Sequence, residues 1–219
     1  QLRPYQSEAV TAIRREWAEG KQRTLLVLPT GGGKTEAYLG LSAYTIFLRR
    51  MLDKDDSGTA ILMRYTLRLL TAQQYERASS MICACEKIRR ENPALFGKNR
   101  LTIGLWVGGA TTPNKTDEAV KAYSELYKDS TKNNPFVILK CPWCGAQMGP
   151  AHPQLPGYRK FRTKSRSFDF AFRCSNSSCD FSNEDLPLYV VDESIYEKTP
   201  TLLLGTVDKF AMLPFRPQA

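Results

Sequence analysis

The sequence predicts an α/β protein: a parallel sheet with helices on both faces, and a small cysteine-rich module inserted late in the chain. Three observations carry this prediction. An apolar run at residues 25–28 leads through a glycine-rich turn into a helical pattern. Further strand and helix patterns alternate after it, as they do in parallel sheets wound by right-handed crossovers. Two close pairs of cysteines, between residues 141 and 179, then interrupt the alternation.

The composition suits one α/β core with a small addition. The chain has 219 residues, 42% of them hydrophobic, which is enough for one sizeable core but does not suggest two equal domains. The formal net charge of +9 suggests an anionic partner, first of all nucleic acid, although a solvated basic surface would carry the same charge. No apolar run is long enough to cross a membrane, and no leader pattern is present.

These features also bear on location. We expect no membrane partner, and the cysteine usage favours a reducing compartment and a bound metal over disulfides, hence a cytoplasmic protein. The chain begins without Met and stops at Ala219. We expect both ends to be cut from a longer protein.

The first segment, residues 2–20, predicts a helix that begins near Pro4 and turns Val10, Ile13 and Trp17 toward a core. The elements expected after the glycine-rich turn are, in order, a helix at about 36–51, a strand at 60–63, a long helix ending near residue 90, a strand at 101–107 and a helix at 116–128. In such a fold the carboxyl ends of the strands share one edge, where ligands bind.

The glycine-rich turn, with the sequence PTGGGKT at residues 29–35, predicts a phosphate-binding loop. Glycines let backbone N–H groups face phosphate oxygens at a helix N-terminus. Lys34 is positioned to bridge terminal phosphates, and the Thr35 hydroxyl to hold Mg²⁺; we assign these two residues the catalytic roles. The alternative is a purely structural turn between strand and helix, but such a turn has little need of a Lys-Thr pair after the glycines.

This loop resembles motif I of superfamily 2 helicases and translocases rather than the loops of kinases or GTPases. A Leu-Arg-Pro-Tyr-Gln stretch at residues 2–6 stands where these proteins place the glutamine that contacts adenine, and an amide suits that role because it offers a donor and an acceptor side by side. A helix-capping or surface glutamine is the alternative. The resemblance implies a RecA-like fold that binds ATP and Mg²⁺. The implied ATP-binding residues are Arg3, Gln6, Pro29, Thr30, Gly31, Gly32, Gly33, Lys34 and Thr35.

Three further stretches resemble the nucleic-acid-binding elements of the same superfamily. Residues 64–74 resemble motif Ia, a Gly-Gly pair follows the strand at 101–107, and residues 201–210 resemble motif Ib. Hydroxyl, amide and guanidinium groups near a helix N-terminus suit phosphate contacts, although ordinary surface side chains and a plain turn would have the same sequence. The implied nucleic-acid-binding residues are Thr66, Arg68, Gln73, Gly108, Gly109, Thr206, Asp208 and Lys209.

An Asp-Glu pair at Asp192 and Glu193 resembles motif II, the acidic pair that holds Mg²⁺ and activates water. Motif II follows motif Ib in this superfamily, whereas here the pair precedes it. We therefore assign this pair to the segment that returns from the cysteine insertion to the sheet. The true acidic pair, motif III and a second RecA-like lobe with its arginine finger are expected beyond Ala219, so this fragment alone should not turn over ATP.

The cysteine pattern, Cys-x₂-Cys followed after 29 residues by Cys-x₄-Cys, predicts a zinc site formed by Cys141, Cys144, Cys174 and Cys179. Four thiolates leave no position for water, so the zinc should be structural, and His152 is expected to be a surface residue. We predict a zinc ribbon at residues 140–185, inserted into a lobe formed by residues 1–139 and 186–219. Cys83 and Cys85 lack nearby partners and are interpreted as core or surface thiols.

Between the cysteine pairs, basic residues alternate with aromatic ones. Phe168, Phe170 and Phe172 follow a period of two, which predicts an inward-facing strand surface. The Lys and Arg cluster at residues 159–166 suits either contact with single-stranded nucleic acid or a solvated surface.

Taken together, these stretches resemble a narrower group, the helicase subunits of the DISARM anti-phage defence system. That resemblance rests on the two nucleotide-site stretches, on residues 63–70, on the four-cysteine insertion and on residues 205–210. It implies a parent protein that is an ATP-dependent DNA helicase or translocase and works with a companion subunit. The alternative is a non-enzymatic zinc-ribbon DNA-binding module with a regulatory nucleotide site.

Overall fold

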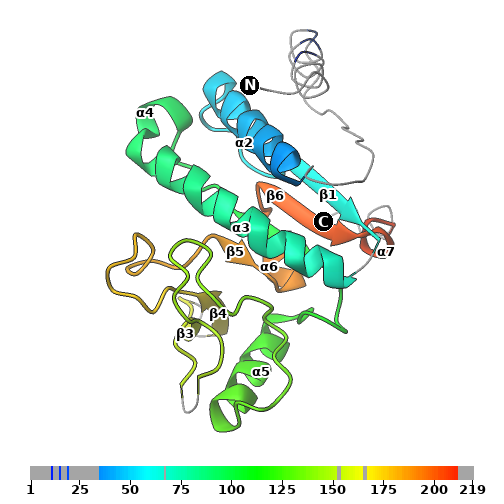
Figure 1. Ribbon diagram of the computed structural model, residues 1–219, viewed down its shortest axis with the longest axis vertical. Coiled ribbons are helices and arrows are strands. Elements are labelled where there is room, and N and C mark those ends of the chain that lie inside the picture. Colours follow the sequence, from blue (N-terminus) through cyan, green and yellow to red (C-terminus); the bar gives the residue numbers. More distant parts are fainter. Residues whose placement is uncertain are drawn as a thin grey trace.

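The computed structural model describes residues 35–66, 68–151, 154–164 and 167–211, with only the backbone of residues 68–70, and also Thr11, Arg15 and Glu19. Its elements are α2 (Thr35–Leu52), β1 (Ile61–Tyr65), α3 (Arg68–Glu91), α4 (Pro93–Phe96), β2 (Ile103–Trp106), α5 (Thr116–Lys128), β3 (Tyr158–Arg162), β4 (Phe168–Phe172), β5 (Leu188–Tyr189), α6 (Asp192–Lys198), β6 (Leu202–Thr206) and α7 (Val207–Phe210) (Figure 1). Within the described part of the chain, no helix combines the length and apolar character needed to span a membrane.

Among the described residues, four strands form a parallel sheet in the order β1-β6-β2-β5. The last described strand, β6, lies between β1 and β2, so that Leu202 stands beside both Ile61 and Ile103. Every residue of β6 is buried, as expected of a central strand in a parallel sheet covered on both faces. The predicted parallel α/β architecture is therefore confirmed.

The two faces of the sheet are covered by different helices. Leu202 and Leu204 point into the main core, where α3 packs across the sheet. The intervening Leu203 points to the opposite face, where it joins Trp106 and Ile195 of α6 in a smaller apolar cluster. This alternation along β6 follows from the two-residue period of a strand. With α3 on one face and α6 on the other, the sheet has helices on both faces, as predicted.

Helix α3 connects the sheet to the cysteine region. Tyr75 and Ile82 are fully buried along its inner face, and the Tyr75 hydroxyl donates to the Tyr189 carbonyl of β5 at 3.1 Å. Cys83 and Cys85 are also buried in the core. Burial raises the pKa of the Cys85 thiol to about 12, so this cysteine stays protonated, consistent with a core residue.

A buried ion pair fixes the turn from α3 into β2. The Glu86 carboxylate, 1% exposed, accepts two hydrogen bonds from the Arg89 guanidinium, each at 2.8 Å. Glu86 also accepts from the backbone N–H of Leu101 at 2.9 Å, and Arg89 donates to the Gly97 carbonyl. Because both charges are paired and hydrogen-bonded to the backbone, their burial is tolerated, and they hold the start of β2 against α3.

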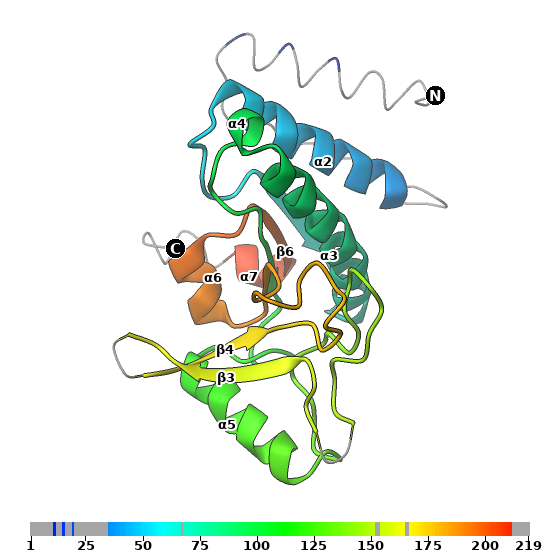
Figure 2. The same ribbon diagram turned by 90° about the vertical axis from the view of Figure 1, so that its left-hand side faces the viewer.

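A separate two-stranded antiparallel ribbon, β3–β4, packs against α5 and lies beside the parallel sheet (Figure 2). Its aromatic core centres on Phe136, which stacks on Phe170 with ring centroids 4.0 Å apart and contacts Phe172 edge-on. The prediction that all three phenylalanines of β4 pack inward is wrong for Phe168, which is 39% exposed. The packed region, around Phe136, ends before this first residue of β4.

Candidate nucleic-acid edge and metal centre

The predicted phosphate loop lies almost entirely outside the described residues. Its exception is Thr35, which is half-buried and is the first described residue of α2. The predicted ATP-binding residues that lie outside are Arg3, Gln6, Pro29, Thr30, Gly31, Gly32, Gly33 and Lys34. His152, expected at the surface, also lies outside.

The predicted nucleic-acid-binding residues gather at one edge of the sheet, which we call the sheet edge: residues 65–66, 106–109 and 206–209. The carboxyl ends of three adjacent strands meet here, with Tyr65 beside Thr206 and Trp106 beside Gly205. Thr66 follows β1 directly, and α3 begins at Arg68 beside it. Three stretches that are far apart in the sequence therefore lie together, with a helix N-terminus that favours anions.

Gln73 lies in the second turn of α3 and is exposed. The side chain of Arg68 is not among the described ones. The two glycines after β2 differ: Gly108 is buried, whereas Gly109 is exposed. Only the second glycine of the pair therefore presents its backbone at the surface.

Lys209 of α7 is committed to an internal ion pair. Its Nζ lies 2.7 Å from Oδ2 of Asp192, whose side chain is 4% exposed, and 5.8 Å from the ring centroid of Trp106. The stem of the lysine crosses Gly108, where an added Cβ would come within 2.9 Å of Cε. Gly108 has φ +89°, so both its backbone conformation and this close approach require glycine.

The Asp-Glu pair begins α6 and makes structural contacts there. It follows β5, at the opposite edge of the described sheet. Glu193 accepts a hydrogen bond from the backbone N–H of Thr116 at 2.8 Å, and this bond holds the pKa of the Glu193 carboxyl below its usual value. With Asp192 bound to Lys209, both acids join the return segment to α5 and α7. Sequence reasoning missed both interactions, because no local pattern marks partners so distant in the chain.

The four predicted zinc ligands come together. The Sγ atoms of Cys141, Cys144, Cys174 and Cys179 all lie within 4.8 Å of one another, and those of Cys144 and Cys174 are 3.4 Å apart. Four sulfurs bound tetrahedrally at about 2.3 Å from zinc would be about 3.8 Å apart. Four cysteine sulfurs at this spacing fit a closed, structural zinc site. This is the arrangement that the Cys-x₂-Cys and Cys-x₄-Cys pairs predict.

The backbone around the cluster supports thiolate ligands. The N–H groups of Asn176 and Phe181 point at the sulfurs of Cys174 and Cys179, at 3.4 and 3.5 Å. Such bonds stabilise negative charge on sulfur. Gly145 turns back at φ +76° and donates to the Cys141 carbonyl at 2.9 Å, which closes the first knuckle.

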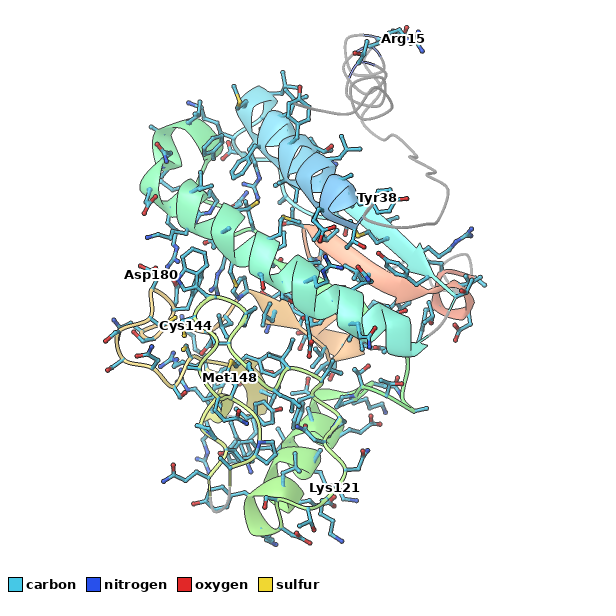
Figure 3. The ribbon with its side chains drawn as sticks, viewed as in Figure 1. Arg15, Tyr38, Lys121, Cys144, Met148 and Asp180 are labelled. Carbon is cyan, nitrogen blue, oxygen red and sulfur yellow. The ribbon has the colours of Figure 1, made fainter. Side chains whose placement is uncertain are left out.

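The cluster is anchored on α3, as Figure 3 shows for Cys144 and Asp180 beside that helix. The Asp180 carboxylate accepts from Trp143 Nε1 at 2.9 Å and from Lys87 of α3 at 3.2 Å. The Arg90 guanidinium lies 4.4 Å from the Phe181 ring centroid and pairs with Glu184. Neither the tryptophan nor these charges carried a signal in the sequence, since a packing contact between two regions has no local motif.

A parallel sheet covered on both faces, with the phosphate-loop sequence leading into α2, defines the class: a RecA-like lobe of the superfamily 2 helicase type. The sequence model described as type III restriction enzyme, res subunit, matches residues 1–194, and the chain belongs to this family. It is similar to DISARM protein DrmA of Bacillus paralicheniformis, with 42% identity over 203 residues that cover 87% of this chain. The chain spans 18% of that relative's length.

Proposed function

We propose that this chain is the ATP-binding lobe of a superfamily 2 DNA helicase or translocase that couples ATP hydrolysis to movement on DNA in defence against phage. The observation that carries the proposal is the sheet edge, where the three predicted nucleic-acid-binding stretches lie on adjacent strand ends. Ligands of open α/β sheets bind at this edge. The name of the similar DISARM protein supports the defence role.

In this proposal Lys34 and Thr35 act on the phosphates of ATP and on Mg²⁺, Gln6 contacts the adenine, and Arg3 is a further ATP-binding residue. The acidic pair and arginine finger come from the rest of the parent protein, including a second RecA-like lobe, and a companion defence subunit is a further partner. Zinc is held by the four cysteines and supplies a structural crosslink in the module at residues 140–185. Its thiolates leave no open coordination position for chemistry.

The experiment is the ATP hydrolysis rate of the full-length parent, with and without DNA, for the natural protein and for Lys34→Ala. We expect DNA to stimulate hydrolysis and Lys34→Ala to lower the stimulated rate by at least about 100-fold, because the charge that stabilises the transferring phosphoryl group is removed. Lys54→Ala is the matched control, since Lys54 is exposed in the loop after α2.

The alternative is a non-enzymatic zinc-ribbon module that binds DNA, in which the nucleotide only regulates the affinity for DNA. A hydrolysis rate indifferent to both DNA and Lys34, with DNA binding retained, would establish that alternative and end the motor hypothesis.

A further inference from the structure

The outer part of the β3–β4 ribbon presents an exposed aromatic ring beside two cations. The Phe168 ring centroid lies 4.3 Å from Lys160 Nζ and 5.1 Å from Arg162 Cζ. Arg162 stands directly opposite Phe168 across the ribbon, and Lys160 is two residues before Arg162. The three side chains therefore share one face of the ribbon. We call Lys160, Arg162 and Phe168 the ribbon patch.

The patch lies beyond the packed core of the ribbon. Along the same face of β4 the exposed fraction rises from 1% at Phe172 and 6% at Phe170 to 39% at Phe168. Figure 2 shows the ribbon extending past the neighbouring elements toward its turn. Phe168 lies outside the buried cluster around Phe136, so its ring is not needed to fill that core.

The charges of the patch are available. Among the described residues, no carboxylate forms an ion pair with Lys160 or Arg162. The other charged residues of strands β3 and β4 are paired within the protein, Arg159 with Asp185 at 3.2 Å and Asp169 with Lys198 at 3.5 Å. The positive charge of the patch is thus left for an external anion.

We propose that the ribbon patch binds single-stranded nucleic acid, with Phe168 stacked on a base and Lys160 and Arg162 on the adjacent phosphates. An accessible base face fits an exposed ring, and the two cations suit a phosphate backbone. In a duplex the base faces are stacked inside, so the ring would have no partner. This proposal rests on the proposed function in one respect: a protein that moves along DNA encounters single-stranded DNA.

The test measures nucleotide-free binding of the full-length parent to a fluorescent oligothymidylate and to a matched duplex, over a series of salt concentrations, by anisotropy. Phe168→Ala should weaken single-strand binding about 10-fold, leave duplex binding unchanged, and be rescued by Phe168→Trp. Lys160→Ala with Arg162→Ala should lower the magnitude of the salt slope for single strands by about 1.4, since each phosphate contact contributes about 0.7.

A matched charge control is the double variant Lys121→Ala with Lys128→Ala. Both lysines are exposed on α5, which packs against the ribbon (Figure 3 shows Lys121). This variant removes the same charge from a nearby surface and should leave the salt slope unchanged. Zinc content and thermal melting confirm the fold of each variant, and Phe168→Leu, which keeps the apolar bulk without an aromatic face, serves where Phe168→Ala does not fold.

Unchanged single-strand affinity in Phe168→Ala or Phe168→Leu overturns the proposal. An equal loss for single strand and duplex also overturns it and marks a non-selective basic surface. The two proposals can fail separately. If DNA still stimulates hydrolysis but Phe168 has no effect on single-strand binding, only the ribbon-patch proposal is refuted. If single-strand binding depends on Phe168 but DNA does not stimulate hydrolysis, only the proposed motor function is refuted.

Discussion

The cations at the sheet edge and those on the ribbon have opposite surroundings. Lys209 lies within a motif that predicts nucleic-acid contact, yet its ammonium pairs with buried Asp192, and its side chain is only 20% exposed. Lys160 and Arg162 belong to no such motif, yet they flank an exposed ring without a described carboxylate partner. A sequence motif can therefore predict a role for a residue, but the charged neighbours in the folded protein decide whether its charge is available to a ligand.

The two regions are also stabilised differently. The sheet edge ends a core of Leu, Ile and Val side chains that are buried from both faces. The ribbon depends on a small aromatic cluster and on the cysteine cluster at its base. A module of this size rarely has enough apolar area to fold by itself. Variants that break one support and leave the other intact make this contrast measurable.

The largest effect is expected from Cys174→Ser, which removes one of the four proposed zinc ligands. Zinc stoichiometry should fall below one, and the free energy of unfolding should drop by about 5 kcal/mol, because metal binding contributes folding energy directly. Zinc analysis and denaturant unfolding measure the two quantities. Cys85→Ala is the control: Cys85 is buried outside the cluster, so zinc should be retained and the loss limited to about 1 kcal/mol. Full zinc content in Cys174→Ser would refute the assigned ligand set.

A smaller effect is expected from Asp192→Asn, which leaves the Lys209 ammonium without its counter-charge. We expect the free energy of unfolding to fall by about 2 kcal/mol, and Lys209→Met in the same chain to restore part of it, because no buried charge then remains unpaired.

The matched control for this pair is Asp169→Asn, which breaks the more exposed, longer pair with Lys198. Its effect should be below about 0.5 kcal/mol. Denaturant unfolding compares the two variants directly, and equal losses would contradict the distinction between the buried and the solvated pair.

The smallest effect concerns Glu193 and pH. The hydrogen bond from Thr116 lowers the pKa of this carboxyl in the folded state below 4.5, so at acidic pH the unfolded chain binds more protons. The stabilisation is fully present above that value and is lost as the pH falls through the lower, folded pKa. Because Glu193 is exposed, the contribution should stay below about 0.5 kcal/mol.

Urea unfolding of the natural protein and Glu193→Gln at several pH values measures this contribution. The stability difference between them should be constant above about pH 5 and shrink below it. A difference that widens as the pH falls would show that the carboxyl is not stabilised in its charged form.

Much of the fold follows from local pattern. The predicted helix at 116–128 matches α5, and the strands expected at 60–63 and 101–107 are β1 and β2 with their ends shifted by one or two residues. Apolar periodicity and turn residues act over a few positions, so they specify elements without knowledge of distant neighbours. The assignment of Phe168 to the core failed for the same reason: a period of two identifies a face but not how far the packing along it extends.

By itself, the sequence determined the types of the described elements and which four cysteines come together, because each of these follows from local spacing. Only the tertiary structure decided that β6 lies between β1 and β2, that Asp192 neutralises Lys209, and that Phe168 stands outside the core. Strand order, charge pairing and depth of burial are set by contacts between segments far apart in the chain. Such contacts form only when the whole core packs, and no local pattern encodes them.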